Sequence, residues 1–311
     1  MRKFRSAALA GAVVLVLAAC SDVSTTVPSS EPSPTTEAPA FPVTIGTGKY
    51  GVTIDEQPAA IVSLSPTATE MLFAIGAGDQ VVAADEYSDY PAEAPTTDLS
   101  GYDPNVEAIV SFEPDLVILE GARGAVVDGL ESLGIPALIQ PAAASLEDTY
   151  AQMKDLGVAT GYVDEATVTI TAMRADIEGA LAAVPDASGI RVYHELDDTY
   201  YSVTTDTFIG QVYAEFGMVN IADAAKGASS GYPQLSAEYI VKADPQLIVL
   251  ADGDCCGQSA ETVAARDGWG DIAAVRDGGL IVIDDSVASR WGPRIVEFIE
   301  AVSAGLQGLA T

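Results

Sequence analysis

The sequence predicts an α/β protein with two Rossmann-like lobes, each built on a mainly parallel sheet, joined by one long backbone α-helix. Short apolar runs typical of buried strands alternate with helical segments on both sides of a long helical stretch, which indicates parallel sheets covered on both faces. A fifteen-residue unit also recurs in both halves of the chain. Beyond its N-terminal leader and linker the chain has about 270 residues, enough for two ordinary domains.

Residues 1–19 have the layout of a secretory signal peptide. Arg2, Lys3 and Arg5 form a basic start, and an apolar run leads through small residues to Cys20. The run is too short for a comfortable membrane span. The tetrad that ends at Cys20 resembles the lipobox of bacterial lipoproteins, which implies cleavage before this cysteine and its acylation. We therefore expect an extracytoplasmic protein anchored to the cell membrane by N-terminal lipid.

Residues 20–40 are predicted to form a disordered tether. They are rich in Ser, Thr, Pro and Glu and hold scarcely any large apolar side chain, so they cannot bury enough surface to fold. From Phe41 the composition becomes that of a globular chain. We expect an N-terminal lobe over 41–158, a linking helix over 159–186 and a C-terminal lobe over 187–311.

The first lobe has alternating strand-like and helical segments. In order, the pattern predicts a strand in 59–66, a helix in 67–78, a strand in 80–85, a helix from 105, a buried strand over Asp115–Leu119, and a helix, glycine and strand in 125–141.

A helical signal then continues over 145–184. Gly157 and Gly161 mark one break in it, and Pro185 and Gly189 end it. Alternation resumes in the second lobe, with segments at 190–196, 199–203, 205–217, 236–253 and 279–285 and a final helix from about Gly292.

The charge balance is strongly acidic. Asp and Glu outnumber Lys and Arg by 45 to 14, and the net charge of −31 becomes −34 once the three basic leader residues are removed. This argues against nucleic acid and anionic membrane surfaces as partners. The acidity is that of a solvated surface, and the sequence leaves open whether it reflects a saline habitat.

The recurring unit aligns 105–119 with 236–250. Six of the fifteen positions are identical, and Ser-Gly-Tyr precedes both copies. Repetition at this scale is typical of a duplicated unit. It makes Tyr102 equivalent to Tyr232, and Glu107 equivalent to Glu238.

Several segments together resemble the substrate-binding proteins of ABC importers for cobalamin and ferric siderophores. They are "IVSLSPTATEMLFAIGAGDQVVAADEYSDYP", "NVEAIVSFEPDLVILEG" and "ASRWGPRIVEFIEAV", and the match runs in order from about Ala60 to the end. The resemblance implies a monomer with two lobes bridged by a long helix, and a ferric siderophore or a cobalamin-type corrinoid held between them. It also implies a membrane permease dimer with its ATPase as partner, and no resident cofactor.

Candidate ligand contacts lie in loops that follow predicted strands, where ligands bind in open α/β sheets. Flat aromatic faces and scarce cations supply the set: Tyr87, Tyr102, Arg123, Tyr232, Arg290 and Trp291. Ordinary loop packing is the alternative for the aromatics, packing at a helix start for Arg290 and Trp291, and charge balance with Glu120 for Arg123. The cobalamin-binding branch often has a tryptophan near the place of Glu120, so the ligand is left open.

Glu107 and Glu238 each lie early in a predicted helix, where a carboxylate favours the helix dipole. In the family that the chain resembles, one surface glutamate of each lobe meets arginines of the permease. The resemblance therefore implies that this equivalent pair docks the two permease subunits.

Cys255 and Cys256 are adjacent, and Cys20 is the remaining cysteine of the chain. In an oxidising exterior paired thiols tend to oxidise, so we expect a vicinal disulfide that stiffens a loop at the rim of the ligand cleft. Two free thiols and ligation of a metal or haem are the alternatives.

Catalysis is not expected. The chain has one histidine, His194, and no nucleophile–base set, P-loop or dinucleotide fingerprint, and the several histidines of zinc importers are missing. The paired aspartates at 197–198 and 284–285 have the pattern of turn formers, with cation binding as the alternative. Two other functions remain: a haem-binding importer component, with His194 or a tyrosine as axial ligand, and a surface sensor or adhesion lipoprotein.

Overall fold

The computed structural model describes residues 40–46, 51–121, 124–184 and 186–309. The predicted leader, Cys20, almost all of the tether and Arg123 lie outside these residues. The described residues belong to one compact unit.

The first lobe is built on a parallel sheet with strand order β4-β3-β5-β6 in the described residues. Its strands are β3 (Ile61–Leu64), β4 (Val81–Ala84), β5 (Leu116–Leu119) and β6 (Ala137–Ile139). Its helices are α1 (Pro66–Ala74), the 3₁₀ turn η2 (Gly78–Gln80), α2 (Val106–Val110), α3 (Gly124–Ser132) and α4 (Leu146–Thr160). Before them, β1 (Val43–Ile45) and β2 (Val52–Ile54) pair antiparallel as a separate hairpin that the sequence analysis did not predict.

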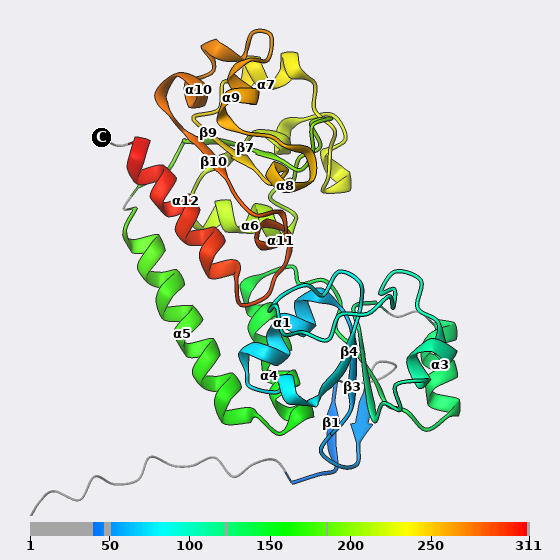
Figure 1. Ribbon diagram of the computed structural model, residues 1–311. Helices are drawn as coiled ribbons and strands as arrows, with labels where there is room; N and C mark the ends of the chain where they lie inside the picture. The colour runs from blue at the N-terminus through cyan, green and yellow to red at the C-terminus, as the bar shows by residue number, and fades with distance from the viewer. Residues whose placement is uncertain (1–39, 47–50, 122–123, 185, 310–311) are drawn as a thin grey trace, which may run out of the picture. The chain divides into compact units, whose positions relative to one another are not determined.

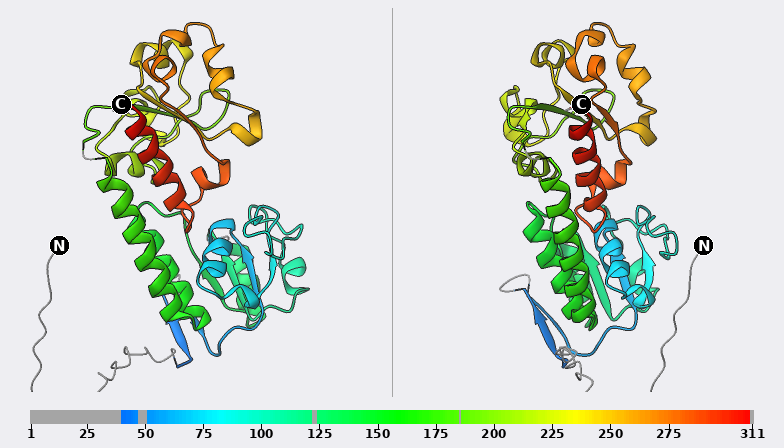
Figure 2. Two further views of the ribbon diagram at one scale, coloured as in Figure 1. Left: turned by 60° about the vertical axis from the view of Figure 1, so that its left-hand side comes forward. Right: turned by 90° about the vertical axis from the view of Figure 1, so that its left-hand side faces the viewer.

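The long helix α5 (Val163–Ala182) joins the lobes and contacts α4 at the first lobe and α12 at the second (Figures 1 and 2). The single break expected at Gly157 and Gly161 is confirmed at Gly161, whose φ is +86°, while α4 runs through Gly157 to Thr160. A Cβ on Gly157 would lie 2.7 Å from Cβ of Ala166. Gly157 therefore lets α4 and α5 pack closely.

The second lobe repeats the architecture, with strand order β8-β7-β9-β10 in a parallel sheet. Its strands are β7 (Arg191–Glu195), β8 (Val219–Asn220), β9 (Leu247–Leu250) and β10 (Leu280–Val282). Its α-helices are α6 (Phe208–Glu215), α7 (Ala237–Ala243), α8 (Gly253–Cys256), α9 (Ala260–Ala264), α10 (Ala273–Asp277), α11 (Asp285–Ser289) and α12 (Ile295–Leu309). Its 3₁₀ turns are η3 (Ile221–Ala224), η4 (Ala228–Ser230) and η5 (Trp269–Asp271).

The two sheets support the duplication seen in the sequence. The aligned units are α2–β5 and α7–β9, and β5 and β9 hold the same place in their strand orders. Each unit also ties its strand, with one side chain, to the start of the neighbouring strand in the sheet, β3 or β7. Asp115 accepts the N–H of Ala60 at 3.0 Å, and Gln246, its aligned partner, accepts the N–H of Arg191 at 2.9 Å.

Both faces of each sheet are buried, as the apolar runs predict. One cluster joins one face of both sheets to α4, α5 and α12. Separate clusters cover the other face of the first sheet with α2 and α3, and of the second sheet with α7, α9 and α10. The predicted fold class is thus confirmed. The segment 199–203, expected within the alternating pattern, does not join either parallel sheet. It forms only an isolated bridge between Tyr201 and Gln234.

Candidate functional site

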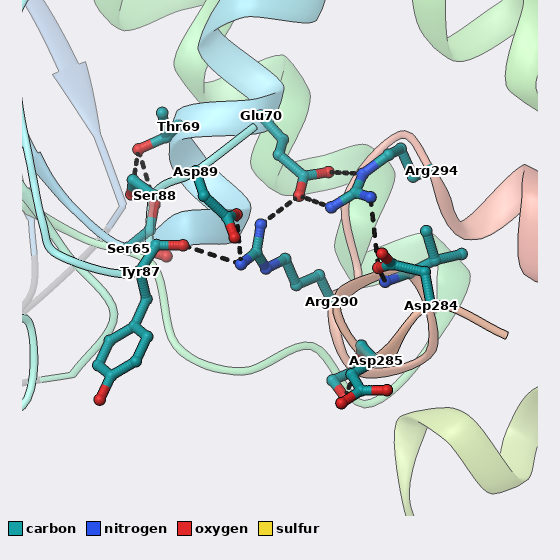
Figure 3. A network of polar contacts seen from close by, with 12 residues as sticks. Ser65, Thr69, Glu70, Tyr87, Ser88, Asp89, Asp284, Asp285, Arg290 and Arg294 are labelled. Carbon is teal, nitrogen blue, oxygen red and sulfur yellow. Dashed lines mark hydrogen bonds and ion pairs between the residues drawn. The ribbon is translucent and has the colours of Figure 1, made fainter. Parts of the chain in front are cut away.

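The loop after β4 presents Tyr87, which is 65% exposed. Asp85, buried two residues before Tyr87, accepts the N–H of Tyr87 at 3.1 Å. Burial raises the pKa of Asp85 because it disfavours the charged form. On the inner side, the hydroxyls of Thr69 and Ser88 lie 2.9 Å apart (Figure 3). The backbone around Tyr87 is therefore held by buried polar contacts while its ring points outward.

Arg290 reaches this loop from the second lobe. Its Nη2 donates to the Tyr87 carbonyl at 2.8 Å and pairs with Asp89 at 2.9 Å, while Nη1 donates to Glu70 at 2.8 Å (Figure 3). Glu70 lies on α1, and its side chain is only 1% exposed. Arg290, expected to grip the ligand, instead connects the two lobes in this structure.

Arg294 completes the contact from the start of α12. It donates to both carboxylate oxygens of Glu70, at 3.0 and 2.6 Å, and its Nη1 lies 3.7 Å from Asp284. Its guanidinium also lies 4.1 Å from the centre of the Tyr90 ring. We call Glu70, Asp89, Asp284, Arg290 and Arg294 the inter-lobe cluster. Its two cations face three carboxylates, of which only Glu70 is deeply buried.

Trp291 follows Arg290 in the chain and is partly buried against the shared core. Its Nε1 donates to Oε1 of Gln152 on α4 at 3.0 Å. It thus packs between elements, and its described contacts are those of a structural residue.

Tyr102 and Tyr232 are 82% and 51% exposed, and each follows a glycine that lets the chain turn closely. A Cβ on Gly101 would lie 2.6 Å from Oδ2 of Asp85 and 2.8 Å from the Leu64 carbonyl, at the end of β3. Gly231 has φ +81°, which favours glycine. The repeated Ser-Gly-Tyr thus presents an exposed tyrosine in each lobe.

The carboxyl edge of the second sheet carries a buried polar group. Glu195 ends β7 and binds both Nη atoms of Arg266, with Nη1 at 2.6 Å from Oε2. Arg266 also lies 4.5 Å from the Trp269 ring centre. Asp252, two residues after β9, is buried beside them.

Cys255 and Cys256 form a disulfide on the exposed surface of α8. The N–H of Cys255 donates to Oδ2 of Asp285 at 3.0 Å, so the segments after β9 and β10 are linked. The cysteine pair therefore lies at the carboxyl edge of the second sheet, near the helix that leads to Arg290.

His194 is not available to a ligand, so its suggested role as a haem ligand is wrong. It is fully buried on β7, its Nδ1 lies 2.6 Å from the Tyr213 hydroxyl, and its ring packs edge-on against Phe298. Burial lowers its pKa to about 3.

Glu107 and Glu238 are exposed in the first turns of α2 and α7, behind the N-caps Asn105 and Ser236. The aspartate pairs mainly shape the backbone: Asp197 accepts the N–H of Thr199 at 2.9 Å, as a turn former does. Within the described ranges, no group of three or more His, Cys, Asp or Glu could hold a metal ion.

A cavity of about 690 Å³ lies away from these residues. It lies between the hairpin strand β2 and the amino ends of β5 and β6, with Asp115 and Pro136 in its wall. None of the predicted site residues lines it.

Sequence reasoning missed Glu70, Arg294, Glu195, Asp252 and Arg266. Glu70 stands in the buried stretch of α1 that also holds Ala68, Met71 and Leu72, and an acidic residue there is a signal for a buried partner. The scarcity of basic residues is a second signal, since few cations were available to pair with it.

Comparison with known proteins gives a consistent result. The model of a family described as "Periplasmic binding protein" matches residues 61–287. An "Uncharacterized ABC transporter substrate-binding lipoprotein YvrC" of Bacillus subtilis is 31% identical over 279 residues, covering 86% of both chains. A "Cobalamin-binding protein" of Halobacterium salinarum is 32% identical over 280 residues, covering 87% of this chain and 75% of that protein.

Among solved structures, the periplasmic vitamin B12-binding protein BtuF of Vibrio cholerae matches with a TM-score of 0.65 at 23% identity, over 81% of this chain and 98% of that one. This likeness supports the fold. In the described residues, no helix is both long enough and apolar enough to cross a membrane.

Proposed function

Since the chain belongs to the periplasmic binding protein family, we propose that it is the lipid-anchored substrate-binding component of an importer for a cobalamin-type corrinoid. Membership makes it an extracytoplasmic, non-enzymatic component of an ABC transporter. The corrinoid, the anchor on Cys20, the monomeric state and the permease contacts are our proposals.

The charge of the candidate site is the observation that favours a corrinoid over the other ligands. Its described arginines are already paired: Arg290 and Arg294 with Glu70, and Arg266 with Glu195. Among the described residues, the exposed groups nearby include the tyrosines Tyr87 and Tyr102 and the carboxylates of Asp89 and Asp284. A corrin ring with amide side chains offers a flat face and N–H donors to such a surface, whereas anionic ferric siderophores and haem propionates would meet repulsion. The name of the Halobacterium relative agrees with this choice.

A titration of the purified protein tests the ligand. Cyanocobalamin is expected to quench tryptophan fluorescence, and the quenching should saturate at low ligand concentration. A ferric hydroxamate, a ferric catecholate and haemin are expected to bind weakly. Tight binding of a ferric siderophore without corrinoid binding would contradict the proposal, and a Soret band in the purified protein would favour the haem importer. Binding of none would favour a sensor or adhesion protein.

Tyr87 and Tyr102 are proposed to lie against the corrin face. Replacing either with alanine should raise the Kd for cyanocobalamin about tenfold, because a stacked aromatic contributes roughly 1–1.5 kcal/mol. Leu133→Ala, at a residue 57% exposed between α3 and β6, is the control and should leave the Kd unchanged. Calorimetry on the four proteins checks this, and equal Kd values would remove both tyrosines from the site.

Glu107 and Glu238 are proposed to dock the permease. The double variant Glu107→Ala/Glu238→Ala should lower uptake by at least about tenfold and leave the Kd for the ligand unchanged, since such charges orient the encounter. Glu131→Ala/Glu300→Ala removes the same charge from exposed positions on α3 and α12 and should transport normally. Uptake by cells carrying this protein with its permease and ATPase is the measurement; normal uptake by the first variant would sink the assignment.

A further inference from the structure

Two buried carboxyl groups lie beside each other at the carboxyl edge of the second sheet. Glu195 ends β7, and Asp252 follows β9, the strand paired with it. Neither residue has any exposed area. Two buried carboxylates cannot both keep their charge cheaply unless cations or protons neutralise them.

The groups around the pair leave one charge unbalanced. Arg266 binds both oxygens of Glu195, and the Tyr193 hydroxyl donates to the same carboxylate at 3.1 Å. Burial first, and then Glu195, raises the pKa of Tyr193, so it remains a donor. From α11, Asp285 brings a further carboxylate, which accepts the N–H of Cys255. In the part of the chain that is described, neither Oδ of Asp252 has a hydrogen-bond donor.

We propose that Asp252 keeps a proton, which it donates to Glu195, and that loss of this proton loosens α8 with its Cys255–Cys256 disulfide. A proton supplies the missing donor without a further ion. The pKa of Asp252 is raised to about 7, first by burial and then by the charge of Glu195, which agrees with this reading.

The backbone of Asp252 carries the change to α8. Its carbonyl accepts the N–H of Cys256 at 3.2 Å and of Gln258 at 3.3 Å. The side chain of Gln258 accepts from Arg266 at 2.6 Å, so the same segment is tied to the buried charges at a second point. Because Asp252 is fully buried, its ionised carboxylate can reach water only if the backbone of this segment moves, and α8 is bonded to that backbone. That α8 borders the ligand cleft rests on the proposed function.

The sign follows from the two pKa values. In the closed segment the pKa is about 7, whereas in an open, hydrated segment it returns to 3.8. With α8 packed as in this structure, Asp252 binds the proton more tightly than it does once α8 has loosened, so protonation stabilises the packed form. This stabilisation is complete below pH 3.8 and is lost as the pH rises to about 7. Opening of α8 should increase about tenfold per pH unit in this interval and level off above it.

Hydrogen exchange of the amides of residues 256–258 tests the proposal. The wild-type rate is divided by that of Asp252→Asn at each pH, which cancels the intrinsic pH dependence of exchange. Between about pH 5.5 and about pH 8.5 this ratio should rise about 30-fold, reaching its plateau near pH 7. Asp254→Asn changes the same charge at an exposed position on α8 and should keep the wild-type rise.

An unchanged ratio would overturn the proposal. So would the absence of a protonated carboxyl band from the infrared difference between wild type and Asp252→Asn near neutral pH, because a bound cation would then neutralise the pair. Cyanocobalamin affinity at the same pH values is a separate readout. A pH-independent affinity with pH-dependent exchange would remove α8 from the cleft rim, whereas no corrinoid binding at any pH would count against the proposed function alone.

Discussion

Replacing Glu70 with alanine is expected to lower the free energy of unfolding by about 3–5 kcal/mol, the usual cost of removing one partner from a buried ion pair. The side chains of Arg290 and Arg294 are 12% exposed, so both guanidinium groups would lose their main buried acceptor with little access to water. The contact also joins α1 of the first lobe to the start of α12. Denaturant unfolding followed by circular dichroism measures the loss.

Matched variants separate the buried charge from the exposed ones. Asp89→Ala removes a partner of Arg290 that is 67% exposed, and should cost only about 0–1 kcal/mol. Glu70→Gln keeps the volume and one acceptor oxygen, and should fall between the two. If Glu70→Ala and Asp89→Ala lost equal stability, the buried carboxylate would not be the centre of the inter-lobe cluster.

The order of strands and helices was predictable because each element carries a local signal. Gly76 and Gly161 end helices with φ of +84° and +86°, and the apolar runs that became β5 and β9 are buried along their whole length. The duplication was also predictable, because six of the fifteen aligned positions are identical in the two units. The lobe boundaries and the N-terminal processing remain predictions.

The inter-lobe cluster was not predictable in the same way. Glu70 and Arg290 are 220 positions apart, and no local pattern pairs them. Loop position and scarcity pointed to Arg290 as a ligand contact. The buried partner of Arg290 is Glu70, which lies in the other lobe, so only the folded structure brings the two side chains together. A cation in an acidic chain thus predicts a buried carboxylate as readily as an anionic ligand.

The same limit applies to the carboxyl edge of the second sheet. The segment at 190–196, expected as part of the alternating pattern, contains the strand β7. A strand buried on both faces sends alternate side chains to opposite sides. Tyr193 and Glu195 therefore face Arg266 and Asp252, whereas His194 faces Tyr213 and Phe298. Because of this alternation, His194, which was considered as a haem ligand, is a core residue, and Glu195 is part of a buried charged site.

His194 should make the protein sensitive to acid. Its pKa is about 3 in the folded chain, against 6.5 for the ordinary side chain, because burial disfavours the imidazolium ion. The unfolded chain therefore takes up a proton that the folded chain refuses, and stability falls as the pH drops from 6.5 towards 3. Between about pH 7 and about pH 4 this amounts to roughly 3 kcal/mol.

Asp252 acts in the opposite direction over the same interval, so the wild-type curve alone cannot isolate the histidine. His194→Asn keeps a polar partner for the Tyr213 hydroxyl and removes the titrating ring, while Asp252 titrates alike in both proteins. The difference in unfolding free energy between wild type and variant should therefore shift by roughly 3 kcal/mol between about pH 7 and about pH 4, to the disadvantage of wild type. Urea unfolding at both pH values measures it. A constant difference would mean that the folded chain accepts the proton on His194, which a ring sealed between Tyr213 and Phe298 should not allow.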